Sequence, residues 1–325
     1  MTDAPRIVFM GTPDFAVPSL DALVEAGLAP VAVVTVPDKP AGRGRKVRRS
    51  AVGEAADHHG IPLLQPQSLK DEAFRQRLIE LEPDIHAVVA FRILPREVYE
   101  TAKLGAFNLH GSLLPAYRGA APINRAIMDG VTETGVTTFF LRPSVDTGDV
   151  ILWRRTPVGP DETAGDVHDR LMEIGAEAVV ETVRRIASGK AEGQPQDDAL
   201  ASPAPKIFRE DAEIDWNRPA GRVHDFVRAL SPYPGAWTTW DPGTGSETLK
   251  VLRTRVWSPE ASGDAEASGA PGEVLDASGA LVIACETGAV EVLEAQRQGK
   301  RRMDAADFLN GADLTPGARF GAAEA

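Results

Sequence analysis

Residues 84–91 read DIHAVVAF, an apolar run that is polar only at Asp84 and His86. Such a run is too continuous for a strand with one solvent-exposed face, and it is typical of a strand buried on both faces of a parallel sheet. Similar runs occur at RIVFM (6–10), PVAVVTV (30–36), IPLLQ (61–65), AFNLH (106–110), VTTFFL (136–141) and VILWRR (150–155). The first half of the chain therefore predicts a buried, mostly parallel sheet.

Segments with a helical apolar period separate these strands. One spans 17–24 and is closed by Gly27, a second spans 74–81, and a long third spans 167–183 and ends near Gly189. Strands alternating with helices, joined by right-handed crossovers, give an α/β fold with a Rossmann-like sheet and helices on both faces. Ligands of such sheets bind beyond the carboxyl ends of the strands.

The composition changes after residue 190. Residues 191–205, AEGQPQDDALASPAP, are polar and proline-rich, as is typical of a linker. A helical face at 223–230 then precedes short strand candidates at AWTTW (236–240), LKVLRTRVW (249–257), GEVLDA (272–277), LVIACE (281–286) and AVEVLEA (289–295). We predict a sheet domain at 1–190, a linker at 191–205 and a smaller β-barrel or sandwich at 206–325.

Composition and charge limit the function. The 325 residues, 43% of them hydrophobic, suffice for two packed cores. With 35 Lys and Arg against 47 Asp and Glu the net charge is −12, so any nucleic acid or other anion must be bound locally. The single Cys285 excludes a disulfide framework and a Cys-rich zinc site. We see no signal-peptide pattern and no membrane-spanning segment, and we expect a cytoplasmic protein.

Polar residues of catalytic type follow the strand at 106–110. Asn108 and His110 are two positions apart, so their side chains leave the same face of the strand. Asp146, in the turn sequence RPSVDTGDVI, follows the strand at 136–141 and can reach the imidazole if the two strands are neighbours. Taken by spacing alone, a histidine at a strand end and an aspartate in a turn are more often structural than catalytic.

These three residue types suit direct transfer of an acyl group to an amine, because no Ser or Cys nucleophile stands among them. The Asn108 amide and the His110 imidazolium can stabilise a tetrahedral oxyanion. Asp146 can orient the ring and favour its charged form. The proton of the attacking amine goes to Asp146 or to His110, and the sequence leaves both open.

The motif NLHGSLLP (108–115), followed by VDTGD (145–149), resembles the formyltransferases that use 10-formyltetrahydrofolate. Their signature is Asn-x-His-x-Ser-Leu-Leu-Pro with a downstream Asp-x-Gly. Within that superfamily the chain resembles the methionyl-tRNA formyltransferase family at FMGTPDFAVPSL (9–20), PDKPAGRGRK (37–46), RGAAPI (118–123) and APKIFREDAEIDW (204–216).

The resemblance implies transfer of a formyl group from 10-formyltetrahydrofolate to the amino group of initiator methionyl-tRNA, for translation initiation. It implies Asn108, His110 and Asp146 as the catalytic set and an OB-like, tRNA-binding domain at 206–325. The implied folate contacts are Phe91, Arg92, Ile93, Ser112, Leu113, Leu114 and Pro115. AFRILP at 90–95 is one residue shorter than the family's usual AYGLILP and has Arg92 in place of glycine, so we expect a reshaped pterin pocket.

Two basic clusters stand out on this acidic chain. The segment 39–49, KPAGRGRKVRR, has glycines that predict a mobile loop, and we expect its charges to bind tRNA phosphates. These residues are Lys39, Arg43, Arg45, Lys46, Arg48 and Arg49. The second cluster comprises Arg297, Lys300, Arg301 and Arg302. A solvated surface remains the alternative for both clusters.

Other classes of function fit less well. The histidines lack a metal-ligand spacing, so we expect no metal. The glycine patterns of nucleoside-triphosphate and dinucleotide sites are missing, which argues against an oxidoreductase. An amino sugar nucleotide formyltransferase, a nucleotide formyltransferase of purine synthesis and an inactive tRNA-binding protein remain as alternatives. We expect a monomer.

Overall fold

The computed structural model describes residues 4–41, 46–241, 245–258, 269–312 and 314–321 of the chain. Contacts divide the chain into two compact units. The first comprises Met1–Pro122, Glu133–Thr156 and His168–Pro205, and the second comprises Ile123–Thr132, Pro157–Val167 and Lys206–Ala325.

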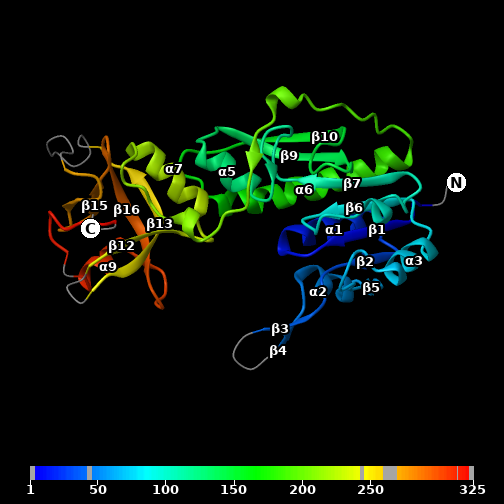
Figure 1. Cartoon of the computed structure of the whole chain (residues 1–325), viewed down its shortest axis with the longest axis horizontal. Coiled ribbons are helices and arrows are strands. Elements are labelled where there is room, and N and C mark those ends of the chain that lie inside the picture. Colours follow the sequence, from blue (N-terminus) through cyan, green and yellow to red (C-terminus); the bar gives the residue numbers. More distant parts are fainter. Residues whose placement is uncertain (1–3, 42–45, 242–244, 259–268, 313, 322–325) are drawn as a thin grey trace. The chain divides into compact units, whose positions relative to one another are not determined.

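The first unit is built on a seven-stranded sheet with the order β10-β9-β7-β6-β1-β2-β5 (Figure 1). The strands are β1 (Ile7–Gly11), β2 (Ala32–Val34), β5 (Leu63–Leu64), β6 (Ile85–Val89), β7 (Gly105–His110), β9 (Glu133–Phe140) and β10 (Val150–Pro157). Along the sheet from β5 through β2, β1 and β6 to β7, each strand pairs in parallel with the next. β7 pairs antiparallel with β9. The predicted mostly parallel α/β sheet is confirmed.

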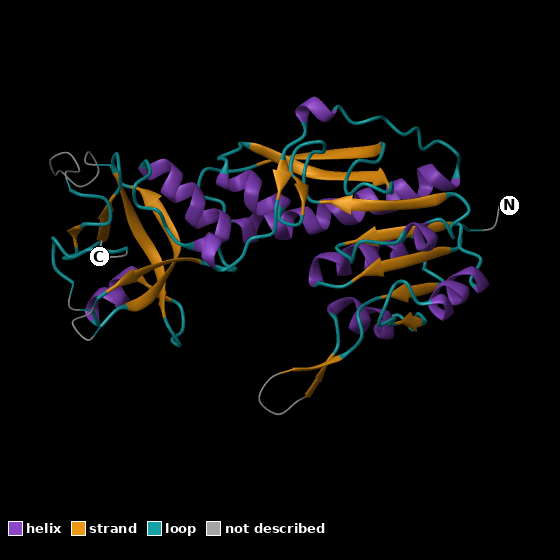
Figure 2. Ribbon diagram, in the orientation of Figure 1, coloured by secondary structure: helices purple, strands orange, loops and turns teal. Residues whose placement is uncertain are grey.

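Helices cover both faces of this sheet (Figure 2). They are α1 (Val17–Glu25), α2 (Ala51–His58), α3 (Glu72–Glu80), α4 (Arg96–Tyr99) and α6 (Ala164–Ala187). Leu109 of β7 packs against Gly175 of α6, where a Cβ would lie 2.7 Å from the leucine Cδ2. On the other face Ala106 and Val88 belong to a cluster with residues of α3 and α4. Successive residues of β7 therefore point to opposite layers.

Two short strand pairs lie outside the sheet. β3 (Lys39–Ala41) and β4 (Lys46–Arg48) form an antiparallel hairpin, although the sequence predicted a mobile loop here. No apolar alternation marks these arms, so the sequence pattern did not reveal their pairing. β8 (Arg118–Gly119) pairs in parallel with β11 (Pro203–Ala204). This pairing joins the end of the predicted linker to the first unit.

The second unit contains α5 (Pro122–Met128) almost entirely, α7 (Ala220–Leu230), α9 (Ala305–Asn310) and an antiparallel sheet. The sheet order is β12-β13-β16-β15-β14, and β17 also pairs with β16. Its strands are β12 (Ala236–Trp240), β13 (Glu247–Val256), β14 (Val274–Asp276), β15 (Leu281–Ala284), β16 (Ala289–Arg297) and β17 (Met303–Asp304). Their positions confirm the predicted small β domain.

The outer strands of this second sheet are joined through one late segment. The N–H of Gly321 donates to Thr239 at β12, while the Val274 N–H of β14 donates to the Ala318 carbonyl. The hydrophobic core beside this sheet contains Trp240 and Phe308, and the centroids of their rings lie 5.4 Å apart. The sheet thus curls toward a barrel rather than ending in two free edges.

Candidate active site

The end of β7 presents Asn108 and His110 on one face, as predicted. Both lie on the same side of the strand as Ala106, which packs toward α3 and α4, and opposite Leu109. Asn108 is half-buried, and its side-chain amide has no hydrogen-bond partner among the described residues. It is therefore available to donate to a ligand.

His110 and Asp146 come together at this point. Nδ1 of His110 stands 3.8 Å from Oδ2 of Asp146, and the two side chains are only 7% and 13% exposed. The separation is too long for a hydrogen bond but within ion-pair range. The sequence predicted that Asp146 can reach the imidazole if the strands before the two residues are neighbours. They are neighbours, because β9, which precedes the Asp146 loop, pairs directly with β7.

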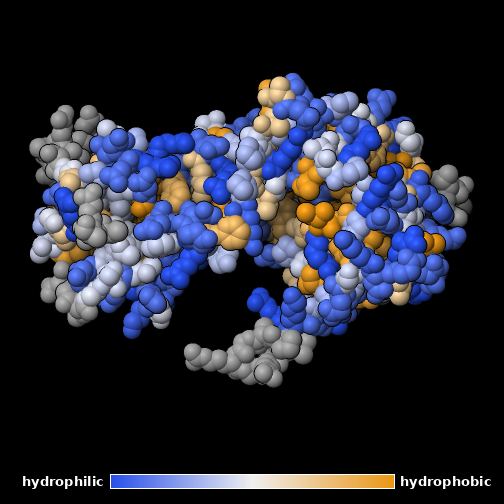
Figure 3. Space-filling view, viewed as in Figure 1, coloured by the Kyte–Doolittle hydropathy of each residue, from blue (hydrophilic) through white to orange (hydrophobic). Residues whose placement is uncertain are grey.

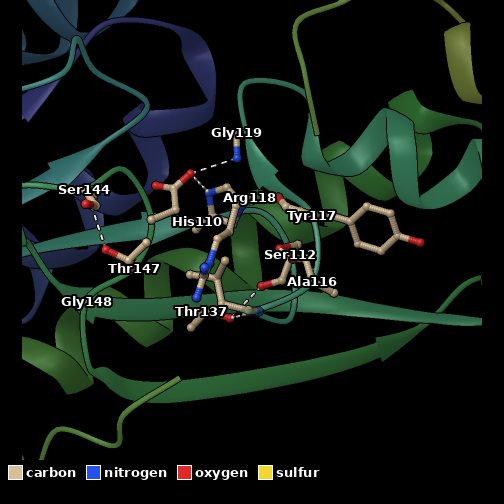
Figure 4. A network of polar contacts seen from close by, with 12 residues as sticks. His110, Ser112, Ala116, Tyr117, Arg118, Gly119, Thr137, Ser144, Thr147 and Gly148 are labelled. Atoms are coloured by element: carbon tan, nitrogen blue, oxygen red, sulfur yellow. Dashed lines mark hydrogen bonds and ion pairs between the residues drawn. The ribbon is translucent and has the colours of Figure 1, made fainter. Parts of the chain in front are cut away.

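The other nitrogen of the imidazole is held by the main chain. Nε2 of His110 lies 2.8 Å from the carbonyl oxygen of Tyr117. Figure 4 labels both residues within the polar network of the site. A carbonyl can only accept, so Nε2 carries the proton. Nδ1 then faces the carboxylate, and protonation at Nδ1 converts this approach into an ion pair.

Asp146 has an unusual backbone. Its φ is +56°, and Oδ2 accepts the N–H of Gly119 over 2.9 Å. Tyr117, at φ +62°, shares the left-handed conformation. Non-glycine residues adopt this conformation at a cost and often where function requires it. Two such residues therefore flank His110.

The Ser112–Pro115 turn is held by a hydrogen bond of its own serine and by hydrogen bonds from β9 and β10. The Ser112 hydroxyl donates to the Ala116 carbonyl over 2.6 Å, and the Thr137 hydroxyl donates to the Ser112 carbonyl over 2.6 Å. The indole of Trp153 donates to the Leu114 carbonyl over 3.0 Å. Of the four predicted folate contacts here, Ser112 and Leu114 are buried, and Leu113 and Pro115 are half-buried.

Arg92 ties the loop after β6 to the loop after β5. Its guanidinium donates to the carbonyls of Pro66 (3.1 Å) and Gln67 (3.3 Å) and lies 5.2 Å from the Phe91 ring centroid. Ile93 is 76% exposed, and apolar residues reach the surface of the first unit (Figure 3). Because β6 and β7 are parallel neighbours, this loop emerges at the same sheet edge as Asn108.

The predicted tRNA-binding residues divide into three groups. Lys39 and Arg48 are exposed and lie directly opposite each other on the β3–β4 hairpin. Arg49 is engaged in ion pairs with Asp38 and Asp57. Lys46 lies on β4, and Arg43 and Arg45 lie outside the described residues.

The second basic cluster is partly neutralised by acids of its own sheet. Arg297 pairs with Glu247 over 2.8 Å and also lies over the Trp240 ring. Arg302 stands 3.8 Å from Glu294. The open alternatives for this cluster, tRNA contact and solvated surface, both remain.

Sequence reasoning missed Gln196, which supports the Asp146 loop. Its amide nitrogen donates to the carbonyls of Asp146 (2.9 Å) and Gly148 (2.8 Å). Its oxygen accepts from Arg118 Nη2 over 2.8 Å. Nothing local marks this residue in a polar, proline-rich segment, because its partners lie far away along the chain.

Within the described ranges no three His, Cys, Asp or Glu residues are grouped so as to hold a metal ion. Among the same residues no helix is both long and apolar enough to cross a membrane.

Comparison with known proteins identifies the family. The Formyl transferase family matches residues 5–183, and the Formyl transferase, C-terminal domain, family matches residues 206–313. A methionyl-tRNA formyltransferase of Porphyromonas gingivalis is 47% identical over 95% of this chain and 96% of its own length. The chain belongs to the methionyl-tRNA formyltransferase family. A family member from Chlorobium luteolum is 49% identical over 94% of this chain and 96% of its own length.

Solved structures share the fold of this formyltransferase. HypX from Aquifex aeolicus, in complex with tetrahydrofolic acid, has a TM-score of 0.62 at 21% identity and covers 94% of this chain. The match covers 47% of HypX, so the chain spans about half of that protein's length. An N-formyltransferase of Helicobacter canadensis, in complex with folinic acid and dTDP-3-aminofucose, has a TM-score of 0.63 at 18% identity, covering 90% of this chain and 99% of that one.

Proposed function

We propose that the chain transfers the formyl group of 10-formyltetrahydrofolate to the α-amino group of initiator methionyl-tRNA, for translation initiation. The observation that carries this proposal is the approach of His110 and Asp146 beside Asn108, at the carboxyl end of β7. The near-full-length similarity to methionyl-tRNA formyltransferases supports the choice of acceptor.

The proposed chemistry needs no covalent enzyme intermediate. The amine nitrogen attacks the formyl carbon and forms the new C–N bond, while the bond between that carbon and folate nitrogen N10 breaks. The Asn108 amide donates to the oxyanion, and a protonated His110 supplies positive charge beside it. The amine loses one proton and the leaving N10 gains one. Either Asp146 takes the proton from the amine and passes it to N10 while His110 stays protonated, or the protonated His110 gives its proton to N10 and the neutral ring then accepts the proton of the amine.

Folate binding is proposed for two loops at one edge of the sheet. The candidates are Phe91, Arg92 and Ile93 after β6, and Ser112, Leu113, Leu114 and Pro115 after β7. The hydrogen bond from Ser112 to Ala116 and the one from Thr137 of β9 to Ser112 support a preformed surface, which reduces the ordering cost of binding. The exposed Ile93 offers apolar contact to a ligand.

The β3–β4 hairpin is proposed to bind tRNA phosphates through Lys39, Arg43, Arg45, Lys46, Arg48 and Arg49. Lys39 and Arg48 face each other across the pair, and like charges directly opposite are destabilising. A phosphate between them would relieve that repulsion. On a chain with net charge −12 such a local cationic site is required for a polyanionic substrate.

The proposal also assigns roles to the three parts of the chain. Residues 1–190 carry catalysis, 191–205 connect, and 206–325 form an OB-like domain that binds tRNA. We further propose that the enzyme acts as a monomer in the cytoplasm.

The test is a formyl-transfer assay with purified protein, 10-formyltetrahydrofolate and initiator methionyl-tRNA. An amino sugar nucleotide serves as a parallel acceptor. We expect formyl-methionine on the tRNA, formed roughly a hundred- to a thousandfold more slowly by His110→Ala. Formylation of the sugar alone would replace the proposed acceptor, and transfer to neither would refute the assignment.

A further inference from the structure

The segment 194–204, predicted as part of a linker, contacts both sides of the site. Between 192 and 201 every residue is exposed except Gln196, and Ser202 and Ala204 are the next residues that turn inward. In Figure 1 the segment runs as a yellow-green coil outside β10, to which the main chain of Gln194 is bridged. Its inward residues all meet loops next to His110.

Gln196 uses the full hydrogen-bonding capacity of its amide. Both N–H groups are directed at the Asp146 loop, toward the carbonyls of Asp146 and Gly148. Its oxygen accepts from Nε (3.2 Å) and Nη2 (2.8 Å) of Arg118. One side chain therefore connects the loop that carries the carboxylate to β8.

Ser202 holds the opposite side of the site. Its hydroxyl oxygen accepts the N–H of Tyr117 over 2.9 Å, and its carbonyl accepts the N–H of Arg118 over 2.8 Å. The Tyr117 carbonyl in turn is the partner of His110 Nε2. Ser202 is thus one residue removed from the imidazole.

Gln196 and Ser202 each bind a residue whose backbone conformation is unfavourable for a non-glycine residue. Asp146 and Tyr117 have the left-handed conformation, and such residues persist only when surrounding contacts over-determine them. Gln196 binds the carbonyl of Asp146, and Ser202 binds the N–H of Tyr117. The same short segment secures both.

We propose that Gln196 and Ser202, the inward polar residues of this segment, form a brace that sets the separation of His110 and Asp146, with Gln196 as a positioning residue for formyl transfer. The inference rests on the proposed function for its kinetic consequence. An unbraced Asp146 loop would move the carboxylate relative to the imidazole, and a misplacement of about 1 Å can cost about a hundredfold in rate.

The test compares Gln196→Glu with Gln194→Glu. The first variant keeps an acceptor for Arg118 but loses both N–H donors to the Asp146 loop. The second makes the same change of charge on an exposed side chain two residues away in the same segment. We expect Gln196→Glu to lower kcat roughly 10- to 100-fold, with KM for both substrates within about twofold of wild type, and Gln194→Glu to retain wild-type kinetics.

A second measurement does not depend on activity. Hydrogen exchange at the Gly119 amide reports the bond to the Asp146 carboxylate. We expect faster exchange in Gln196→Glu and wild-type exchange in Gln194→Glu. If the wild-type chain formylates neither acceptor, the proposed function fails, and exchange at Gly119 still decides whether the brace exists.

Several results would overturn the brace. An unchanged kcat in Gln196→Glu, a rise in KM for tRNA alone, or a lower kcat with wild-type exchange at Gly119 would each do so. If Gln196→Glu does not fold, Ser202→Ala, which removes the acceptor for Tyr117, is judged by the same kcat and exchange criteria.

Discussion

The main-chain N–H of Gly119 donates over 2.9 Å to Oδ2 of Asp146, the same oxygen that stands 3.8 Å from Nδ1 of His110. The carboxylate thus has a fixed partner on one side and the imidazole on the other. Gly119 itself is confined, since its φ is +130° and an added Cβ would lie 2.5 Å from the Ala204 carbonyl oxygen. The charge arrangement of the site depends on a backbone position that only glycine fits.

Gly119→Ala should therefore reduce activity by displacing β8 from β11. We expect kcat to fall at least about tenfold, because the donor to Asp146 moves with the backbone. Gly189→Ala is the control, since Gly189 also has a positive φ but open space around it. It should cost about 1–2 kcal/mol of stability and leave kcat unchanged. Equal kcat values for the two variants would contradict the role of Gly119.

Asn108→Ala and His110→Ala should each lower kcat by roughly a hundred- to a thousandfold, because each removes a group that stabilises the oxyanion. KM for tRNA should change little, since neither residue belongs to the proposed phosphate-binding set. Steady-state kinetics with varied tRNA and folate separate the two parameters. A rise in KM at constant kcat would place these residues in binding rather than in catalysis.

Lys39→Ala and Arg48→Ala should each raise KM for tRNA. Each should also reduce the slope of log affinity against log salt by about 1, the value for one phosphate contact. Arg49→Ala should have a smaller effect on that slope, because Arg49 is already paired with Asp38 and Asp57. Lys103→Ala, an exposed lysine of the first unit, is the control. If it matches Lys39→Ala, the charge effect is not local to the hairpin.

His86 should make the folded state sensitive to acid. Burial lowers the pKa of this histidine from 6.5 to about 4. Between these values the unfolded chain binds more protons than the native one, so stability is lost as pH falls. The loss should reach about 3 kcal/mol at pH 4.

Urea denaturation from pH 7 to pH 4 measures this contribution. His86→Gln removes the titrating group, so its free energy of unfolding should decline less steeply than that of wild type over this range. Parallel curves for the two proteins would show that His86 makes no contribution to acid sensitivity.

Much of the fold was predictable from the sequence because its strands are buried. DIHAVVAF and AFNLH became β6 and β7, and their parallel register places Asn108 beside Val88. The period of two also predicted that Asn108 and His110 share a face. These inferences needed only local patterns and one rule of sheet topology.

The brace was not predictable in the same way. Gln196 meets partners 78 residues away at Arg118 and 50 residues away at Asp146, and no local period reports such contacts. The β3–β4 hairpin was missed for a different reason, since its strand sequences, KPA and KVR, show no alternating apolar pattern. The orientation of the His110 ring required the position of the Tyr117 carbonyl.

The closure of the second sheet has a consequence for synthesis of the chain. β12 through β17 leave the ribosome before residues 318–321, so the strands can pair while β12 and β14 still present unbonded edges. Unbonded edges recruit strands from other molecules. A chain cut between Asn310 and Ala318 would keep every strand of that sheet and lose the segment that joins its edges, and it should aggregate at concentrations at which the intact chain remains in solution.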